Sequence, residues 1–118
     1  MSTLKEICKE NKDGFTLDMK TGNHAEHKIG YYVSMTNNII DKHDTGISFD
    51  IFLKCFNMLQ NMCDKQLYIG GWLDGSKYFL DITFHIKTES MSLARTLGRE
   101  FGQDSIYSVK EQRSIPIY

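Results

Sequence analysis

The chain has 118 residues, a length that excludes a multidomain protein. Of these residues 41% are hydrophobic and 25% are charged, and this composition excludes a largely disordered protein. Its 14 Lys and Arg against 15 Asp and Glu give a net charge of −1, which argues against direct nucleic-acid binding because no basic surface is supplied. No apolar run approaches the about 20 residues that a membrane-spanning helix needs.

The three cysteines point to a reducing compartment. Cys8, Cys55 and Cys63 are odd in number and have no CxxC spacing, and the first residues carry no apolar leader. We therefore expect a cytoplasmic protein, formed by a single domain over residues 1–118.

A short helix is predicted at the start of the chain. Thr3 and Glu6 have the spacing of a capping box, and Gly14 follows a polar stop signal. These features place the helix over residues 3–12.

Two segments of alternating apolar and polar residues come next. GFTLDMK at residues 14–20 and IGYYVSMT at residues 29–36 each place their apolar side chains on one face of a strand. We predict that the two strands form a hairpin with the polar residues 21–28 at its tip.

Residues 36–47 read as an exposed loop, because their asparagines, aspartates and glycine follow no period. Ser48 is then a plausible N-cap of a helix over residues 48–63. The polar residues of this helix form one narrow stripe: Asp50, Lys54, Asn57, Asn61 and Asp64.

The rest of that helix is apolar over two adjoining faces. One face carries Phe49, Phe52, Phe56 and Leu59, and the other carries Ile51, Cys55, Met58 and Met62. Either the helix packs on a sheet and is flanked by other helices, or the second face is the surface of a homodimer or a partner complex, for which methionines are well suited.

Residues 67–86 predict a β-hairpin around the motif IGGWLDGSKYFLD. An Asp74-Gly75 type I′ turn fits its centre. The resulting register pairs Leu73 with Ser76, Gly71 with Tyr78, Ile69 with Leu80 and Leu67 with Ile82. Trp72 then lies opposite Lys77, where a cation–π contact can form.

The two faces of this hairpin differ in composition. We predict that the aliphatic face is buried against the helix of residues 48–63, through Leu67, Ile69, Leu80, Ile82 and Phe84. The other face carries Tyr68, Trp72, Phe79, Asp81, Thr83, His85 and Lys87. It is too aromatic for simple exposure, so either a helix or loop covers it or it is a recognition surface.

A third helix follows, with Leu93, Leu97 and Phe101 on one face and Gly102 as its stop. DSIYSVK and SIPIY then predict two short strands, the last at a sheet edge because of its proline. The order α-β-β-α-β-β-α-β-β predicts an α+β fold, with three helices on an antiparallel or mixed sheet of four to six strands.

Catalytic and metal-binding signals are weak. The histidines and acids of two loops form the strongest metal-like cluster, but a hairpin tip is a poor scaffold for zinc: His24, Glu26, His27, His43 and Asp44. No phosphate loop or nucleophile elbow is present, and Cys55 and Cys63 are expected to be inert core residues. Asp81 and His85 share a strand face, where an acid–base pair or a merely polar face are both open. We expect no metal, no cofactor and no catalytic residue.

Three segments together resemble small accessory proteins of bacteriophages and other mobile elements: GFTLD followed by GYYVS, the hairpin YIGGWLDGSKYFLDIT, and the ending LGREFGQDSIYSVKEQRSIPI. Such modules also occur within large polyvalent phage proteins. The resemblance covers residues 14–118 and carries no activity. It implies the cytoplasm of a bacterial host cell as the location. It also implies a gene neighbourhood in which small non-enzymatic proteins inhibit host defences, including anti-CRISPR inhibitors.

The leading hypothesis is therefore a binding protein that inhibits a host defence protein or nuclease complex by occlusion. Its rivals are a small-ligand or nucleotide-sequestering domain and a minor hydrolase. The expected binding residues are Trp72, Tyr68, Lys77 and Tyr32, because aromatic side chains beside a cation supply contact area at low entropy cost.

Overall fold

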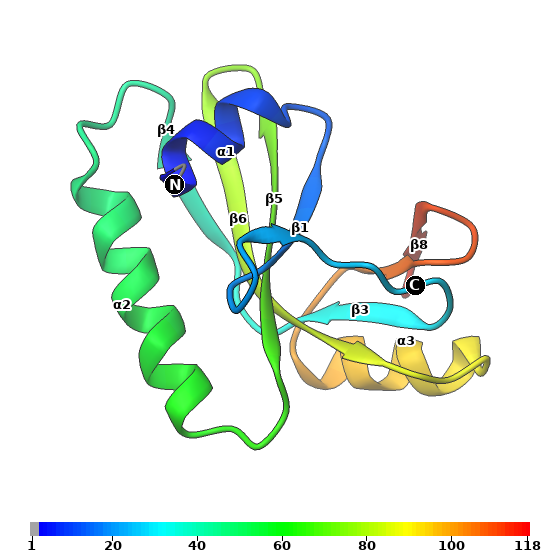
Figure 1. The fold of residues 1–118 in the computed structure, drawn as a ribbon. Helices are drawn as coiled ribbons and strands as arrows, with labels where there is room; N and C mark the ends of the chain where they lie inside the picture. Colours follow the sequence, from blue (N-terminus) through cyan, green and yellow to red (C-terminus); the bar gives the residue numbers. More distant parts are fainter. Residues whose placement is uncertain (1–2) are drawn as a thin grey trace.

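The computed structural model describes residues 3–118 as three helices on one eight-stranded antiparallel sheet (Figure 1). The helices are α1 (Leu4–Glu10), α2 (Ile47–Asn61) and α3 (Met91–Glu100). The strands are β1 (Phe15–Asp18), β2 (Asn23–His24), β3 (Tyr31–Ser34), β4 (Asn38–Asp41), β5 (Leu67–Asp74), β6 (Lys77–Ile86), β7 (Ser105–Ser108) and β8 (Arg113–Pro116). The α+β class and the antiparallel sheet are confirmed, but the sheet has more strands than the four to six predicted.

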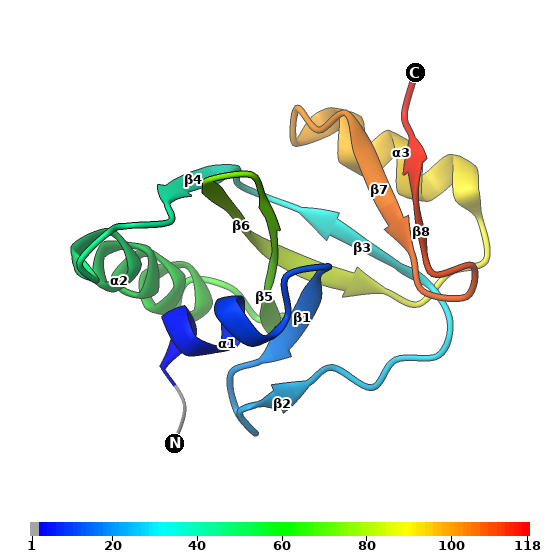
Figure 2. The ribbon, with the colours of Figure 1, turned by 90° about the horizontal axis from the view of Figure 1, so that it is seen from above.

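The strands follow the order β2-β1-β5-β6-β3-β7-β8, and β4 also pairs with β6. β6 is long enough to serve two neighbours on one side: its first half pairs with β4 and its second half with β3. Between them, the Met35 amide donates to the carbonyl of Ile82, and the Thr36 hydroxyl accepts from the Ile82 amide. The sheet curls along this line into a half-barrel, with β7 and β8 turned away from the plane of β1 and β5 (Figure 2).

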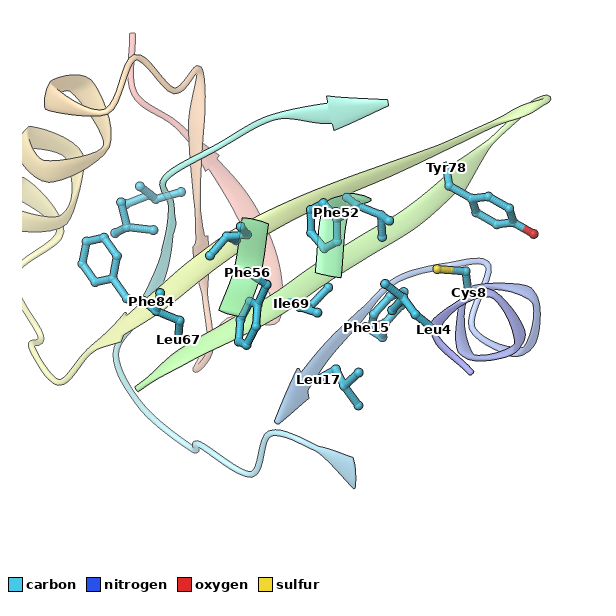
Figure 3. Close-up of a cluster of buried hydrophobic side chains, with 14 of the residues drawn as sticks. Leu4, Cys8, Phe15, Leu17, Phe52, Phe56, Leu67, Ile69, Tyr78 and Phe84 are labelled. Atoms are coloured by element: carbon cyan, nitrogen blue, oxygen red, sulfur yellow. The ribbon is translucent and has the colours of Figure 1, made fainter. Parts of the chain in front are cut away.

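The core lies between α2 and the β5–β6 hairpin. Phe52 and Phe56 of α2 point onto this hairpin beside Leu67 and Ile69 (Figure 3), and Ile82 on β6 is 1% exposed. The predicted inner face of the hairpin is confirmed, since all five of its expected core residues are buried: Leu67, Ile69, Leu80, Ile82 and Phe84.

The predicted register of that hairpin is wrong by two positions. Trp72 pairs with Phe79 rather than Lys77, and Gly70 pairs with Asp81. The turn residues are Gly75 and Ser76, and a glycine at φ 62° in the first turn position is what a type II′ turn requires. A shift of two keeps every side chain on its predicted face.

The predicted hairpin of residues 14–20 and 29–36 does not form. β1 pairs with β2 and β5, whereas β3 pairs with β6 and β7. The central β5–β6 hairpin has two edges: β1 pairs with the β5 edge, and β3 pairs with the β6 edge.

Part of the predicted loop 36–47 is a strand. β4 pairs with β6, and within it Ile40 is 4% exposed while Ile39 is 60% exposed. Two apolar residues among polar ones are too short a run to show a period, which is why the sequence predicted a loop.

The predicted N-cap Ser48 lies inside α2, which begins after Gly46. Asp44 caps the helix instead: one of its carboxylate oxygens accepts from the amides of Gly46 at 2.8 Å and Ser48 at 3.2 Å. The Ser48 hydroxyl donates to the other oxygen at 2.9 Å. At the start of the chain, by contrast, Thr3 caps α1 as predicted.

Only one of the two apolar faces of α2 is buried. Phe49, Phe52 and Phe56 are in the core, but Ile51, Met58 and Met62 are 57%, 65% and 81% exposed. The first of the two alternatives, burial of this second face against other helices, is therefore wrong, and the homodimer or partner surface stays a prediction.

α3 buries only part of the face predicted, since Leu97 packs partly buried against the core but its two neighbours on that face do not. Leu93 and Phe101 are 50% and 40% exposed, and the buried residues are Ala94 and Gly98. A side chain at Gly98 would come within 2.9 Å of Ile106, so the lack of one lets α3 lie close to β7.

Candidate functional site

The outer face of the β5–β6 hairpin forms the floor of an open cavity, which we call the aromatic pocket. Its volume is about 570 Å³, and its lining comes from β1, β3, β5, β6, β7 and β8. The side chains that give it character are Tyr32, Ser34, Trp72, Asp81 and Tyr107. The pocket exists because the sheet curls.

Paired glycines on β5 make room on both sides of the sheet. A methyl group at residue 70 would collide with Oδ1 of Asp81 on the pocket side. At residue 71 a methyl group would lie 2.6 Å from Leu80 and 2.7 Å from Phe15. Gly70 therefore leaves space for a carboxylate, and Gly71 lets aliphatic and aromatic groups pack against the backbone.

Asp81 is the charged group of the pocket. Its side chain is partly exposed, but protein atoms surround the carboxylate, and this loss of solvent raises its pKa. The Ser34 hydroxyl donates to Oδ2 at 2.5 Å and opposes the increase in pKa, as does the backbone of Gly70. Residues 3–118 form one ion pair, between Arg113 and Glu111, so no cationic side chain of this part of the chain neutralises Asp81.

Four rings gather on the outer face of the sheet, and we call them the ring cluster: His27, Tyr32, Tyr68 and His85. Tyr32 is the member that also lines the pocket. The rings of His27 and His85 stack at 3.7 Å, and Nδ1 of His27 shares a hydrogen bond of 2.8 Å with the Tyr32 hydroxyl. Burial lowers the pKa of His27, with His85 adding to the effect, and burial raises the pKa of Tyr32 to about 12. Through His27, and through the hydrogen bond between His85 and the carbonyl of Ile29, the cluster holds residues 25–30 against the outer face of the sheet.

The four predicted binding residues fall into three settings. Tyr32 and Trp72 both line the pocket, and Trp72 is 48% exposed. Tyr68 is 7% exposed inside the ring cluster, and Lys77 lies opposite Asp74 beside the hairpin tip, outside the pocket lining. The outer face is thus covered at one end and open at the other.

Trp72 stacks on Phe79, with ring centroids 4.7 Å apart and planes 15° from parallel. This contact replaces the predicted cation–π contact with Lys77, because the register of β5 on β6 places Phe79 opposite Trp72. Ile39 pairs with Phe79 from the far side, so three neighbouring strands carry an apolar row of Ile39, Phe79 and Trp72. Ile39 was missed because its strand was predicted to be a loop.

Asp81 and His85 do not form the acid–base pair that the sequence left open. Asp81 bonds to Ser34, whereas Nε2 of His85 donates to the carbonyl of Ile29 at 2.7 Å. Ser34 was missed as a site residue, because its place beside Asp81 depends on the pairing of β3 with β6. The one sequence signal was an aspartate within the apolar run YFLDITF.

The metal-like cluster of the sequence is dispersed. His24 is exposed on β2, His27 belongs to the ring cluster, and Asp44 caps α2. Across residues 3–118, no three His, Cys, Asp or Glu side chains gather as metal ligands would.

The cysteines differ from their expected settings. Cys8 is buried, and burial raises the pKa of its thiol to about 12. Cys55 is exposed and Cys63 partly buried, so the expectation that both are core residues is wrong for Cys55. Cys55 is exposed because α2 packs on the sheet with one face only.

A larger hollow of about 880 Å³ lies between α1, α2 and the β1–β2 turn. Its charged lining includes Glu10, Lys20 and Asp50, which are all exposed. It holds no arrangement comparable to the carboxylate and rings of the aromatic pocket, which we therefore take as the candidate site.

In the part of the chain that the structure describes, no helix combines the length and apolar character needed to cross a membrane. Comparison with protein-family models, with curated proteins and with solved structures found no match for this chain.

Proposed function

We propose that this chain is a non-enzymatic binding protein that recognises a protein partner with the aromatic pocket and the apolar row. The observation that carries the proposal is Trp72, which is 48% exposed, stacked on Phe79 and placed at the cavity. Tryptophan and tyrosine dominate the binding energy of protein interfaces, because they bury a large area at little cost in side-chain entropy.

The chemistry of the pocket disfavours nucleotides and nucleic acids as ligands. Its described lining contains Asp13 and Asp81 but no Lys, Arg or His, and the whole chain has a net charge of −1. A phosphate group would meet two acids and no cation there. This weakens the nucleotide-sequestering alternative.

The apolar row favours a macromolecule over a free small molecule. Ile39 is 60% exposed and lies two strands away from Trp72, so a ligand confined to the pocket would leave it in water. A partner surface could cover the row and the pocket together.

The resemblance to accessory proteins of phages and mobile elements guides the choice of partner. We propose a protein of a bacterial defence complex, such as a CRISPR nuclease complex, which the chain inhibits by occlusion. Binding without catalysis is supported by the separate hydrogen-bond partners of Asp81 and His85.

The test is a titration of the chain into DNA-cleavage reactions of purified CRISPR nuclease complexes. We expect stoichiometric inhibition of one complex, weakened about thirty-fold by Trp72→Ala, which corresponds to about 2 kcal/mol of binding free energy. Tyr118→Ala is the matched control, since Tyr118 is an aromatic residue 82% exposed and outside the pocket lining. Circular dichroism checks that both variants are folded.

A second candidate is a domain that binds a small ligand, since a cavity of about 570 Å³ lies within the size range of small-molecule sites. If Trp72→Ala inhibits as well as the parent chain, and a metabolite instead raises the melting temperature, the second candidate replaces the first.

A further inference from the structure

We infer that the aromatic pocket receives the guanidinium group of an arginine presented by the partner, with the Asp81 carboxylate as its anionic acceptor. The inference rests on the proposed function, and it names the chemical group that the pocket selects. It is carried by the juxtaposition of an uncompensated carboxylate, flat aromatic walls and a glycine floor.

The charge of the pocket calls for a cation. The Asp81 carboxylate has lost much of its water and is hydrogen-bonded by the Ser34 hydroxyl and the Gly70 backbone, but it has no Lys or Arg partner in residues 3–118. Asp13 adds a second acid to the lining. A carboxylate in such surroundings gains more from an entering cation than an exposed one, because the local dielectric is lower than that of water.

The shape of the pocket favours guanidinium over ammonium. Tyr32 and Tyr107 lie nearly parallel, with ring centroids 6.2 Å apart and planes 29° from each other, and Trp72 lines the same pocket. A guanidinium group is planar, stacks on aromatic faces and donates paired hydrogen bonds to a carboxylate. A lysine ammonium is compact and strongly hydrated, so it would use these walls less well.

The floor makes room for the carboxylate. Asp81 lies over Gly70, and its Oδ1 occupies the space that a methyl group at residue 70 would take. The Ser34 hydroxyl donates to Oδ2, and the backbone of Gly70 also hydrogen-bonds to the carboxylate. The glycine thus lets the carboxylate lie close to the β5 backbone, where Asp81 lines the pocket.

The first test is an NMR titration of the ¹⁵N-labelled chain with the peptide acetyl-Leu-Arg-Leu-amide. The control peptide replaces arginine by citrulline, which has the same shape but no charge. We expect the amide signals of Gly70, Asp81 and Ser34 to shift with the arginine peptide, which should bind at least about tenfold more tightly than the citrulline peptide. Equal affinities, or no shift at these three amides, would overturn the inference.

Two variants locate the charge that matters. Asp81→Asn should remove the preference for arginine over citrulline, whereas Asp13→Asn, which changes an exposed acid of the same pocket, should keep most of it. Retention of the full preference in Asp81→Asn would overturn the assignment of this carboxylate. If that variant does not fold, the comparison of the two peptides on the parent chain remains decisive.

A third probe, agmatine, separates this inference from the proposed function. It carries the guanidinium group without a peptide. We expect it to bind more weakly than the arginine peptide, and we expect Trp72→Ala to reduce that difference. If agmatine binds as tightly as the peptide, and Trp72→Ala affects both equally, protein recognition fails while guanidinium selection stands.

Discussion

The two faces of the β5–β6 hairpin alternate along the same residues, yet they reach opposite states. On the inner face Ile69 and Ile82 are 0% and 1% exposed, whereas on the outer face Trp72 is 48% exposed and Asp81 lines a cavity. α2 covers the inner face with three phenylalanines, while the outer face has the ring cluster at one end and an open pocket at the other. Burial on this hairpin is therefore set by the elements laid over it as well as by its own alternation.

The largest effect should come from the inner face. Ile82→Ala should lower the free energy of unfolding by about 2–4 kcal/mol, because it leaves a cavity in a core that has no solvent access. Urea denaturation measures this change. Lys87→Ala, an exposed substitution just beyond the same strand, should alter stability little. Equal effects from the two substitutions would mean that the inner face is not the core.

The paired glycines allow the two faces to be compared directly. Gly71→Ala pushes a methyl group against Leu80 and Phe15 in the core, and we expect a loss of about 1–3 kcal/mol in unfolding free energy. Gly70→Ala pushes on the side chain of Asp81, which can move toward the pocket, so its loss in stability should be smaller. Its main effect should be weaker binding of the arginine peptide. A Gly70→Ala variant that binds normally would show that the floor is not part of the site.

The pH dependence of stability should report on the outer face. The pKa of Asp81 is raised above the ordinary value of 3.8, so the folded chain holds this proton more tightly than the unfolded chain. Its stabilising contribution is therefore present below pH 3.8 and is lost as the pH rises through the folded pKa.

Asp81→Asn removes this ionisation, so it should raise the melting temperature at neutral pH relative to its effect at about pH 3. Thermal melts of both chains across this range measure the difference. A difference that stays constant with pH would show that the carboxylate is not buried as described.

The smallest effect is expected at the hairpin tip. Lys77 is exposed opposite Asp74 and does not line the pocket, so Lys77→Ala should change stability by no more than about 0.5 kcal/mol. Inhibition and peptide binding should also change little. A large loss of binding would extend the recognition surface from the pocket to the tip.

In the β5–β6 hairpin, local patterns in the sequence were enough to assign faces but not partners. The alternation of residues 67–86 placed Ile82 inside and Trp72 outside, because a period of two needs no knowledge of the rest of the chain. Which residues pair depended on the conformation of Gly75, which selected a turn one position further on.

The site itself needed contacts between residues far apart in the sequence. Ser34 and Asp81 are 47 positions apart, and they meet because β3 joins the edge of the central hairpin instead of pairing with β1. The predicted outer-face residues Trp72 and Asp81 were visible from the alternation, but the cavity between β1 and β7 was not. The shape of the cavity comes from the curl of the sheet, and no short segment of the sequence predicts that curl, because it depends on how distant strands pair.

The shared use of β6 by β4 and β3 has a consequence for how the chain opens. From Lys77 to Phe84 the strand has β5 on one side, and on the other it has β4, then the contacts of Met35 and Thr36, then β3. β2 and β8, by contrast, lie at the ends of the sheet, where local fraying is enough to expose a backbone amide. The amides that join β6 to β5 should therefore exchange their hydrogens with solvent only when the whole sheet comes apart, which makes them natural reporters of global unfolding.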